Sequence, residues 1–283
     1  MKLIKVSTNI IDQENGLEGI YKAIELAGRT CYKSEDKITP TSAEEFVNRM
    51  IKSGHYAMLE FGTVYLRIPM QYKDIDIYSN NPYSKVSFIK ETLSWYITTN
   101  YRVIIENNLL KDLDYLCEPT EYHEKRICVR FTMDRIGSQS LCRRRVFSFA
   151  QESTRYCNYS KDKFGNELTF IIPSWLNIKE CTINTSTMSG EQLLLASNTD
   201  SSINFIQALS NTELNYFELL RKGHTPQEAR QVLPNALKTE INMCGFVSDW
   251  KHFFKLRDST AAHPDMKALA TPLHEEFKRL LLV

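Results

Sequence analysis

Three consecutive arginines, Arg143 to Arg145, stand among apolar residues near the middle of the sequence, and Ser153 and Arg155 follow shortly after them. Guanidinium groups bind phosphate and carboxylate through paired hydrogen bonds, and a serine hydroxyl adds a further donor. In an extended segment Ser153 and Arg155 would face the same side, because alternate residues of a strand share a face. The pattern predicts a site for a small dianion such as a nucleotide phosphate.

The same cluster is compatible with two other roles. Charged clusters often form a solvated basic surface or a set of structural ion pairs. Arginines interleaved with Phe147, Phe149 and Tyr156 could also bind a nucleic acid, whose bases stack on aromatic rings. The formal net charge of only +1 disfavours a dedicated nucleic-acid binder, which usually has a clear excess of basic residues. Spacing alone leaves these alternatives open.

The composition is that of an ordinary folded protein. The 283 residues, 42% hydrophobic and 24% charged, suffice for a sizeable core without disulfides. We find no apolar run of membrane-spanning length and no signal-peptide pattern, so we expect a cytoplasmic protein that is not in a membrane. The seven cysteines include no CxxC pair, so we expect free thiols and no metal site. Cys142 and Cys157, which flank the arginine segment, are expected to be buried as small hydrophobic residues.

Hydrophobic periodicity predicts the elements that position these residues. The predicted strands cover residues 2–6, 63–68, 127–132 and 168–172. The predicted helices cover residues 16–28, 191–222, 248–257 and 264–282, and a short helix ends at the triple arginine. Thr41 and Glu44 have capping-box spacing at the start of a helix that ends at Gly54. Thr225 and Glu228 have the same spacing and predict a further helix that contains Arg230.

These elements favour an α/β fold, with a central sheet flanked by helices and a helix-rich C-terminal third. Residues from about 70 to 126 are rich in Tyr, Asn, Asp and Lys and contain few glycine or proline breaks. We expect them to be an inserted segment with one helix over about 101–116. Because the chain shows no repeat and no obvious linker, we expect a single domain over residues 1–283.

The arginine segment resembles the signature of the flavin-dependent thymidylate synthases. That signature is Arg-His-Arg, seven residues and Ser, and in its longer form it is RHRxxSxNExSxR. Here Arg143-Arg144-Arg145 is followed after seven residues by Ser153, and Ser148 and Arg155 also fall on fixed positions. Arg144 replaces the family's usual histidine, and Ala150-Gln151 replaces Asn-Glu.

Two further blocks carry the same resemblance in the same order. Residues 54–60, GHYAMLE, are similar to the family's flavin-binding GHxSxLEH block, with Ala57 in place of Ser or Thr and Phe61 in place of the final His. Residues 229–263 contain ARQVLPNALKTEI and SDWKHFFKLRDSTAAH, which are similar to the ARxxLP and WxHFxxLR segments of the family. Phe246 stands where many members have Asn. Residues 70–126 are similar only to the longer members.

The resemblance assigns residues to two ligands. By similarity the dUMP site consists of Ser140, Arg143, Gln151, Glu152, Ser153, Thr154, Arg155, Arg230 and Arg257. By similarity the FAD site consists of His55, Ala57, Glu60, Arg143, Arg144, Arg145, Gln151, Phe246 and His252. Arg257 matches the arginine that polarises the uracil base and is the implied catalytic residue. Taken singly, an arginine at the end of a helix is more often a favourable charge at the negative end of the helix dipole.

The resemblance implies an enzyme with one catalytic domain that makes dTMP from dUMP by reductive methylation. In this family NADPH reduces bound FAD, methylenetetrahydrofolate supplies the carbon, and no enzyme nucleophile is needed. It also implies a homotetramer with active sites shared between subunits, acting on small molecules rather than nucleic acid. The alternatives are a catalytically impaired, nucleotide-binding homologue and a nucleic-acid-binding protein that uses the arginine segment.

Overall fold

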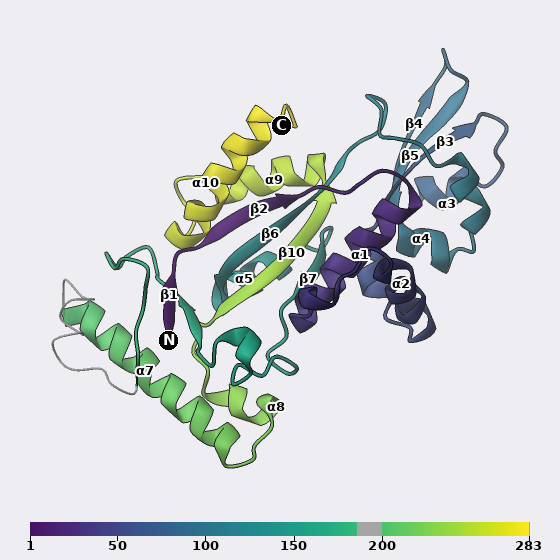
Figure 1. Cartoon of the computed structure of the whole chain (residues 1–283). Coiled ribbons are helices and arrows are strands. Elements are labelled where there is room, and N and C mark those ends of the chain that lie inside the picture. The colour runs from purple at the N-terminus through teal and green to yellow at the C-terminus, as the bar shows by residue number, and fades with distance from the viewer. Residues whose placement is uncertain (186–199, 283) are drawn as a thin grey trace.

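A four-stranded antiparallel sheet forms the centre of the protein (Figure 1). The computed structural model describes residues 1–185 and 200–282. The strand order is β2 (Ser7–Ile11), β6 (Arg126–Asp134), β10 (Lys238–Phe246) and β7 (Ser148–Gln151). β10 pairs along its whole length with β6 and over four residues with β7. The long strand β6 confirms the one predicted over residues 127–132.

Two C-terminal helices cover one face of this sheet (Figure 1). They are α9 (Val247–Arg257) and α10 (Pro264–Arg279), which confirm the helices predicted over 248–257 and 264–282. Phe131 and Met243 of the sheet pack in one cluster with Trp250, Phe253 and Phe277 of the helices. Each such side chain contributes roughly 1.5–3 kcal/mol when fully buried, so this face anchors α9 firmly to the sheet.

Helix α1 (Gly16–Tyr32) covers the opposite face and contacts β7 and β10. Ile20, Ile24 and Ala27 are buried at the spacing of one helical face. A Cβ atom on Gly28 would lie 2.4 Å from the Phe46 ring, so glycine is needed where α2 (Ser42–Lys52) crosses α1. The helix predicted over 16–28 is confirmed and extends one turn further.

The segment before and within the predicted insertion builds a second sheet. Its order is β3 (Thr63–Pro69), β5 (Ser94–Asn100) and β4 (Lys85–Ile89), all antiparallel. Helices α2, α3 (Ile75–Ser79) and α4 (Tyr101–Glu106) and the 3-10 turns η2 (Tyr56–Phe61) and η3 (Leu110–Tyr115) surround its hydrophobic core, to which α1 contributes Ile20 and Ile24. The sequence predicted β3 but not β4 or β5. Residues 70–126 therefore share a core with the preceding strand, and their status as an insertion stays a prediction.

The single helix predicted over 101–116 is wrong. α4 ends at Glu106, and Asn108 adopts a left-handed backbone conformation with φ of +59°. Asparagine tolerates this conformation better than most residues. The chain therefore turns before η3, and the apolar periodicity of this segment is divided between two elements.

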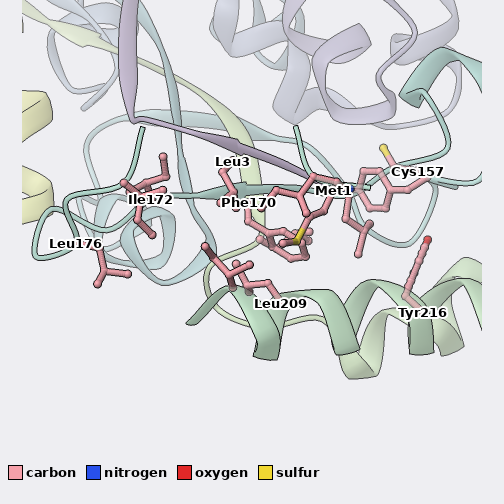
Figure 2. Close-up of a cluster of buried hydrophobic side chains, with 14 of the residues drawn as sticks. Met1, Leu3, Cys157, Phe170, Ile172, Leu176, Leu209 and Tyr216 are labelled. Atoms are coloured by element: carbon pink, nitrogen blue, oxygen red, sulfur yellow. Dashed lines mark hydrogen bonds between the residues drawn. The ribbon is translucent and has the colours of Figure 1, made fainter. Parts of the chain in front are cut away.

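The N-terminal strand belongs to a third sheet, of order β8-β1-β9. β1 (Lys2–Ile4) pairs with β8 (Thr169–Ile171) in parallel and with β9 (Cys181–Thr182) in antiparallel. Long helix α7 (Asp200–Arg221) packs against it through Leu209 and Tyr216 (Figure 2). α7 confirms the predicted helix over residues 200–221. The predicted residues 191–199 lie outside the part of the chain that the structure describes.

Two predicted capping boxes have different outcomes. Thr225 caps α8 (Pro226–Ala229) and exchanges hydrogen bonds with Glu228, as predicted. Thr41 stands at the N-cap of α2 but makes no capping hydrogen bond, so that capping box is wrong. α8 is only four residues long, so Arg230 begins the 3-10 turn η5 (Arg230–Val232) rather than standing within a helix.

Within the described residues no helix is long and apolar enough to cross a membrane.

Candidate functional site

The short helix α5 (Arg135–Cys142) brings the first arginine to the site. Asp134 accepts a hydrogen bond of 2.6 Å from the backbone nitrogen of Gly137 and so fixes the start of the helix. The helix ends at Cys142 with Arg143 as its C-cap, which confirms the helix predicted before the triple arginine. Arg143 and Arg145 are exposed, and Arg144 is half-buried.

Arg257 meets this segment from the end of α9. Its Nη2 donates a hydrogen bond of 2.8 Å to Oγ of Ser140, which stands 117 residues earlier in the chain. Burial lowers the pKa of Arg257, and the charges of Arg144 and Arg143 lower it further. We call these three guanidinium groups, with Ser140, the arginine cluster.

Nothing in the described residues neutralises the arginine cluster. Across residues 1–185 and 200–282, no carboxylate forms an ion pair with Arg143, Arg144 or Arg257. The Nε atoms of Arg144 and Arg257 are buried and have no hydrogen-bond partner. Guanidinium groups that lie close together and have unpartnered hydrogen-bond donors favour the binding of an anion. The cluster can therefore hold a phosphate or stabilise negative charge on a ring.

The segment after β7 forms a second group of predicted site residues. The backbone nitrogen of Arg155 donates to Oγ of Ser153 at 3.3 Å, and Tyr156 N donates to the Ser153 carbonyl at 3.2 Å. These bonds make a turn, so the expectation that Ser153 and Arg155 share one face of an extended segment is wrong. Serine favours such turns because its hydroxyl bonds to the following backbone.

This turn is joined to α8 and η5. Arg155 Nε donates to Gln227 Oε1 at 3.1 Å, and Arg230 Nη1 contacts Thr154 Oγ1 at 3.5 Å. The structure therefore brings together three of the residues assigned to dUMP, Thr154, Arg155 and Arg230, from segments far apart in the sequence. Arg230 is half-buried and Arg155 exposed, so both retain donors for a ligand.

Gln151 and Glu152 already have protein partners. Gln151 Nε2 donates to Ser138 Oγ at 2.8 Å, which ties β7 to α5. Glu152 is only 2% exposed, and its carboxylate accepts from Tyr159 at 3.0 Å and from Lys238 at 3.0 Å. The Glu152 carboxylate is thus held within the protein, where it anchors the start of the turn at Ser153.

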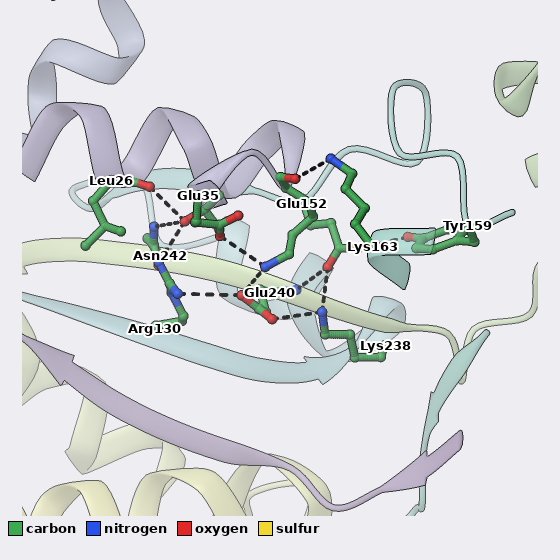
Figure 3. Close-up of polar contacts among 11 residues, drawn as sticks. Leu26, Glu35, Arg130, Glu152, Tyr159, Lys163, Lys238, Glu240 and Asn242 are labelled. Carbon is green, nitrogen blue, oxygen red and sulfur yellow. Dashed lines mark hydrogen bonds and ion pairs between the residues drawn. The ribbon is translucent and has the colours of Figure 1, made fainter. Parts of the chain in front are cut away.

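Glu152 belongs to an ion-pair network that the sequence did not predict (Figure 3). We use this name for Lys33, Arg130, Glu152, Lys238 and Glu240. Glu240 lies 2.9 Å from Lys238, 3.0 Å from Lys33 and 3.7 Å from Arg130. Burial alone would raise the pKa of Glu240, but Lys238 and Lys33 lower it to about 2. The network connects the end of α1 to β6, β10 and the segment that follows β7.

The residues assigned to FAD by similarity are spread over several elements. His55 and Ala57 are exposed at η2, and Glu60 forms an ion pair of 2.7 Å with Arg102. His252 is exposed on α9. In the described part of the chain, no hydrogen bond or ion pair connects His55 or Glu60 with the arginine cluster.

Phe246 is buried at the junction of β10 and α9. Lys85 Nζ lies 5.5 Å from the centroid of its ring, and the guanidinium carbon of Arg126 lies 5.6 Å from it. Cations at this range are attracted to the face of an aromatic ring. The ring therefore has two cationic partners within the protein, and it offers no hydrogen bond to a ligand.

The two cysteines beside the arginine segment differ. Cys157 is buried in the core cluster with Met1, Leu3 and Phe170, as expected (Figure 2). Cys142 is exposed, so that expectation is wrong. It is the last residue of α5, where the helix end faces solvent. All seven cysteines are free thiols.

Comparison with known proteins identifies similar sequences and structures. Residues 123–281 match the family model described as thymidylate synthase complementing protein. The flavin-dependent thymidylate synthase of Mycobacterium avium (strain 104) is 24% identical over 253 residues, which cover 87% of this chain and 71% of that protein. Among solved structures, the UMP/dUMP methylase PolB from Streptomyces cacaoi has a TM-score of 0.45 and 13% identity, covering 99% of this chain and 92% of that one. Thymidylate Synthase X from Helicobacter pylori, solved with FAD and dUMP, has a TM-score of 0.41 and 14% identity over 95% and 92% of the two chains.

Proposed function

The chain belongs to the thymidylate synthase complementing protein family, and from this premise we propose that it is a flavin-dependent thymidylate synthase. The proposed reaction is the reductive methylation of dUMP to dTMP. The observation that carries the proposal is the arginine cluster, in which three guanidinium groups converge without a carboxylate partner in the described residues. Such a site suits an anionic substrate whose negative charge increases during the reaction.

The arginine cluster and the turn at Ser153 both contribute residues to the proposed dUMP site. Arg143 and the free donors of Arg155 and Arg230 are suited to the phosphate, because guanidinium groups bind phosphate oxygens in pairs. Arg257 is held by Ser140 at 2.8 Å and retains an unpartnered Nε. It is therefore positioned to stabilise negative charge that develops on the uracil ring, and guanidinium stays protonated at neutral pH.

The residues present fit a flavin nucleotide in part. The buried, unpartnered Nε of Arg144 and the exposed side chains of Arg143 and Arg145 suit a pyrophosphate. Bound FAD, reduced by NADPH, would supply the hydride, with methylenetetrahydrofolate as the carbon donor. His55 and His252 are exposed and can contact such a group at a junction between subunits. We include a homotetramer with shared sites in the proposal for this reason.

Absorbance spectroscopy tests the proposal directly. Purified protein, with FAD added if needed, should show flavin absorbance that NADPH bleaches when dUMP is present. With methylenetetrahydrofolate added, dTMP should form, as measured by chromatography of the nucleotides. Protein that takes up no FAD and forms no dTMP would contradict the assignment.

Phe246 favours one alternative, a homologue that binds nucleotide without turnover. Its ring lies near two cations of the same chain. Unlike the asparagine that many family members have here, it cannot form an amide hydrogen bond to a flavin. This alternative predicts tight dUMP binding with neither flavin absorbance nor dTMP, and isothermal titration with dUMP distinguishes it. A nucleic-acid binder would instead show binding to oligonucleotides that weakens steeply with salt.

A further inference from the structure

Two cysteines face each other on the α1 side of the central sheet. Cys128 of β6 and Cys244 of β10 are direct partners in the antiparallel register. Directly opposed residues of such a pair have Cα atoms about 4.5–5.5 Å apart. A disulfide needs Cα atoms between about 4.4 and 6.8 Å apart. The expected Cα separation of Cys128 and Cys244 therefore lies within the range that a disulfide needs.

Both thiols line a partly enclosed cavity of about 200 Å³. Its walls come from α1, from η2, from strands β2, β3, β6 and β10 and from the segment before β6, and they include Ile20, Ala27 and Phe61. Cys244 is buried, while Cys128 is partly exposed. A water molecule occupies about 30 Å³ in the liquid, so the cavity has room for a small oxidant beside the sulfur atoms.

Arg126 provides positive charge at this cavity. It lies two residues before Cys128 on the same strand, is only 7% exposed and lines the cavity. Its Nη1 donates to the carbonyl of Glu60 at 3.0 Å, and its Nε has no partner. The Glu60 carboxylate is instead paired with Arg102 at 2.7 Å. The charge of Arg126 is therefore left to act on the neighbouring thiols.

The two thiols differ in acidity. A hydrogen bond from Cys128 lowers the pKa of Cys244, against the effect of burial, and the charge of Arg126 lowers it further. Glu60 opposes this shift by raising the pKa of Cys244. The interaction with Cys244, together with burial, raises the pKa of Cys128. The cysteine that is more readily a thiolate is thus Cys244, and thiolates are the reactive form.

We propose that Cys244 and Cys128 form a modification site for hydroperoxides, at which the two thiols close to a reversible disulfide between β6 and β10. Cys244 is the attacking residue and Cys128 the resolving one. The site is distinct from the arginine cluster, because it lies on the face of the sheet that α1 covers. It does not depend on the proposed enzymatic activity.

The chemistry balances in two steps. The Cys244 thiolate attacks one oxygen of the hydroperoxide, an S–O bond forms, the O–O bond breaks, and the alkoxide or hydroxide leaves and takes up a proton. The Cys128 sulfur then attacks the Cys244 sulfur, an S–S bond forms, the S–O bond breaks, and water leaves with the Cys128 proton. The two thiols lose two electrons, and the peroxide bond gains them.

Hydrogen peroxide is the probe for the first test. The full-length protein is treated with it, unfolded, blocked with an alkylating reagent and digested for mass spectrometry. We expect the peptides of Cys128 and Cys244 to be linked, with the loss of two hydrogen masses, and dithiothreitol to reverse the link. The control is Cys157→Ser, which removes an equally buried thiol from another core and should leave the link intact.

Single substitutions then separate the roles of the two cysteines. Cys128→Ser should leave a sulfenic acid on Cys244 that dimedone labels, whereas Cys244→Ser should abolish rapid peroxide uptake at Cys128. Arg126→Gln should slow oxidation of Cys244 about tenfold, because less of the thiol is ionised. Arg67→Gln, an exposed arginine on β3, is its control.

Two results would overturn the proposal. One is oxidation confined to the exposed Cys142, with no linked peptides from Cys128 and Cys244. The other is a Cys128→Ser protein in which dimedone labels Cys244 no faster than the buried Cys157. If Arg126→Gln fails to fold, the two cysteine variants still decide the outcome.

Discussion

The arginine cluster and the ion-pair network both bring charged side chains together, but they differ in how their charges are balanced. In the network, Glu152 and Glu240 lie within 3.0 Å of Lys238. In the cluster, the described residues provide only a neutral hydroxyl, that of Ser140, as a partner for Arg257. The charges of the network are matched within the chain, whereas those of the arginine cluster are available to a ligand. The balance of charge, rather than the number of charges, distinguishes the ion-pair network from the proposed ligand site.

Removing a partner from the ion-pair network should give the largest effect. Lys238→Met leaves Glu152 buried without its cation, and breaking a buried pair in this way costs about 3–5 kcal/mol of unfolding free energy. Urea unfolding measures the loss. The control is Lys278→Met, whose exposed ion pair with Glu275 should cost less than about 1 kcal/mol. Equal losses in both variants would remove the distinction between buried and exposed pairs.

Removing a charge from the arginine cluster should lower activity without lowering the free energy of unfolding. Arg257→Ala should fold normally, because it loses one hydrogen bond but also relieves repulsion from Arg143 and Arg144. Formation of dTMP should fall by about 100- to 1000-fold, the usual effect of losing one group that stabilises developing charge. Arg279→Ala, at the exposed end of α10, should retain full turnover. Normal turnover in Arg257→Ala would contradict the proposed role.

Acid should weaken the network selectively. The pKa of Glu240 is lowered to about 2 from its ordinary value of 4.5, so its contribution to stability is complete above pH 4.5 and is lost as the pH falls towards 2. The contribution is about 3 kcal/mol. Glu240→Gln should flatten the fall in unfolding free energy between these pH values. If the unfolding free energy of Glu240→Gln falls between pH 4.5 and pH 2 as steeply as that of the unsubstituted protein, Glu240 is not responsible for the loss of stability in acid.

The middle arginine should show the smallest effect. Arg144→His restores the residue usual in the family and should keep activity within about tenfold below pH 6.5, where the imidazole is charged. Above that pH activity should decline, because the cluster loses one positive charge. Arg144→Lys is the control and should show no decline over this range. Identical pH profiles for the two variants would mean that charge at this position is unimportant.

Local patterns predicted much of the fold. β3, β6 and α9 were predictable because their apolar periodicity is set by neighbours in the sequence. β10 was not predicted, although Ile241 and Met243 alternate with Glu240 and Asn242 as in a half-buried strand. The polar side chains have their partners on other elements, and these partners are Lys33, Arg130 and Thr30.

The residue types of the candidate site could be predicted from the sequence, but its geometry could not. The signature assigns Arg143 and Ser153 to the site by similarity, whereas the turn in which the backbone nitrogen of Arg155 donates to Ser153 Oγ could not be inferred from a strand pattern. The contact between Ser140 and Arg257 spans 117 residues and depends on how the sheet positions α5 and α9. Cys128 and Cys244 likewise meet only through the pairing of two distant strands.

β10 passes directly into α9, with Phe246 ending the strand and Val247 beginning the helix. One uninterrupted path of regular structure therefore leads from Lys238 to Arg257, and it contains no loop that could absorb a change in length. Inserting or deleting a single residue in β10 would turn every following side chain of the strand to the other face. It would also rotate α9 and carry Arg257 away from Ser140. We expect the length of this stretch to be far less tolerant of insertion and deletion than its amino-acid identities are of substitution.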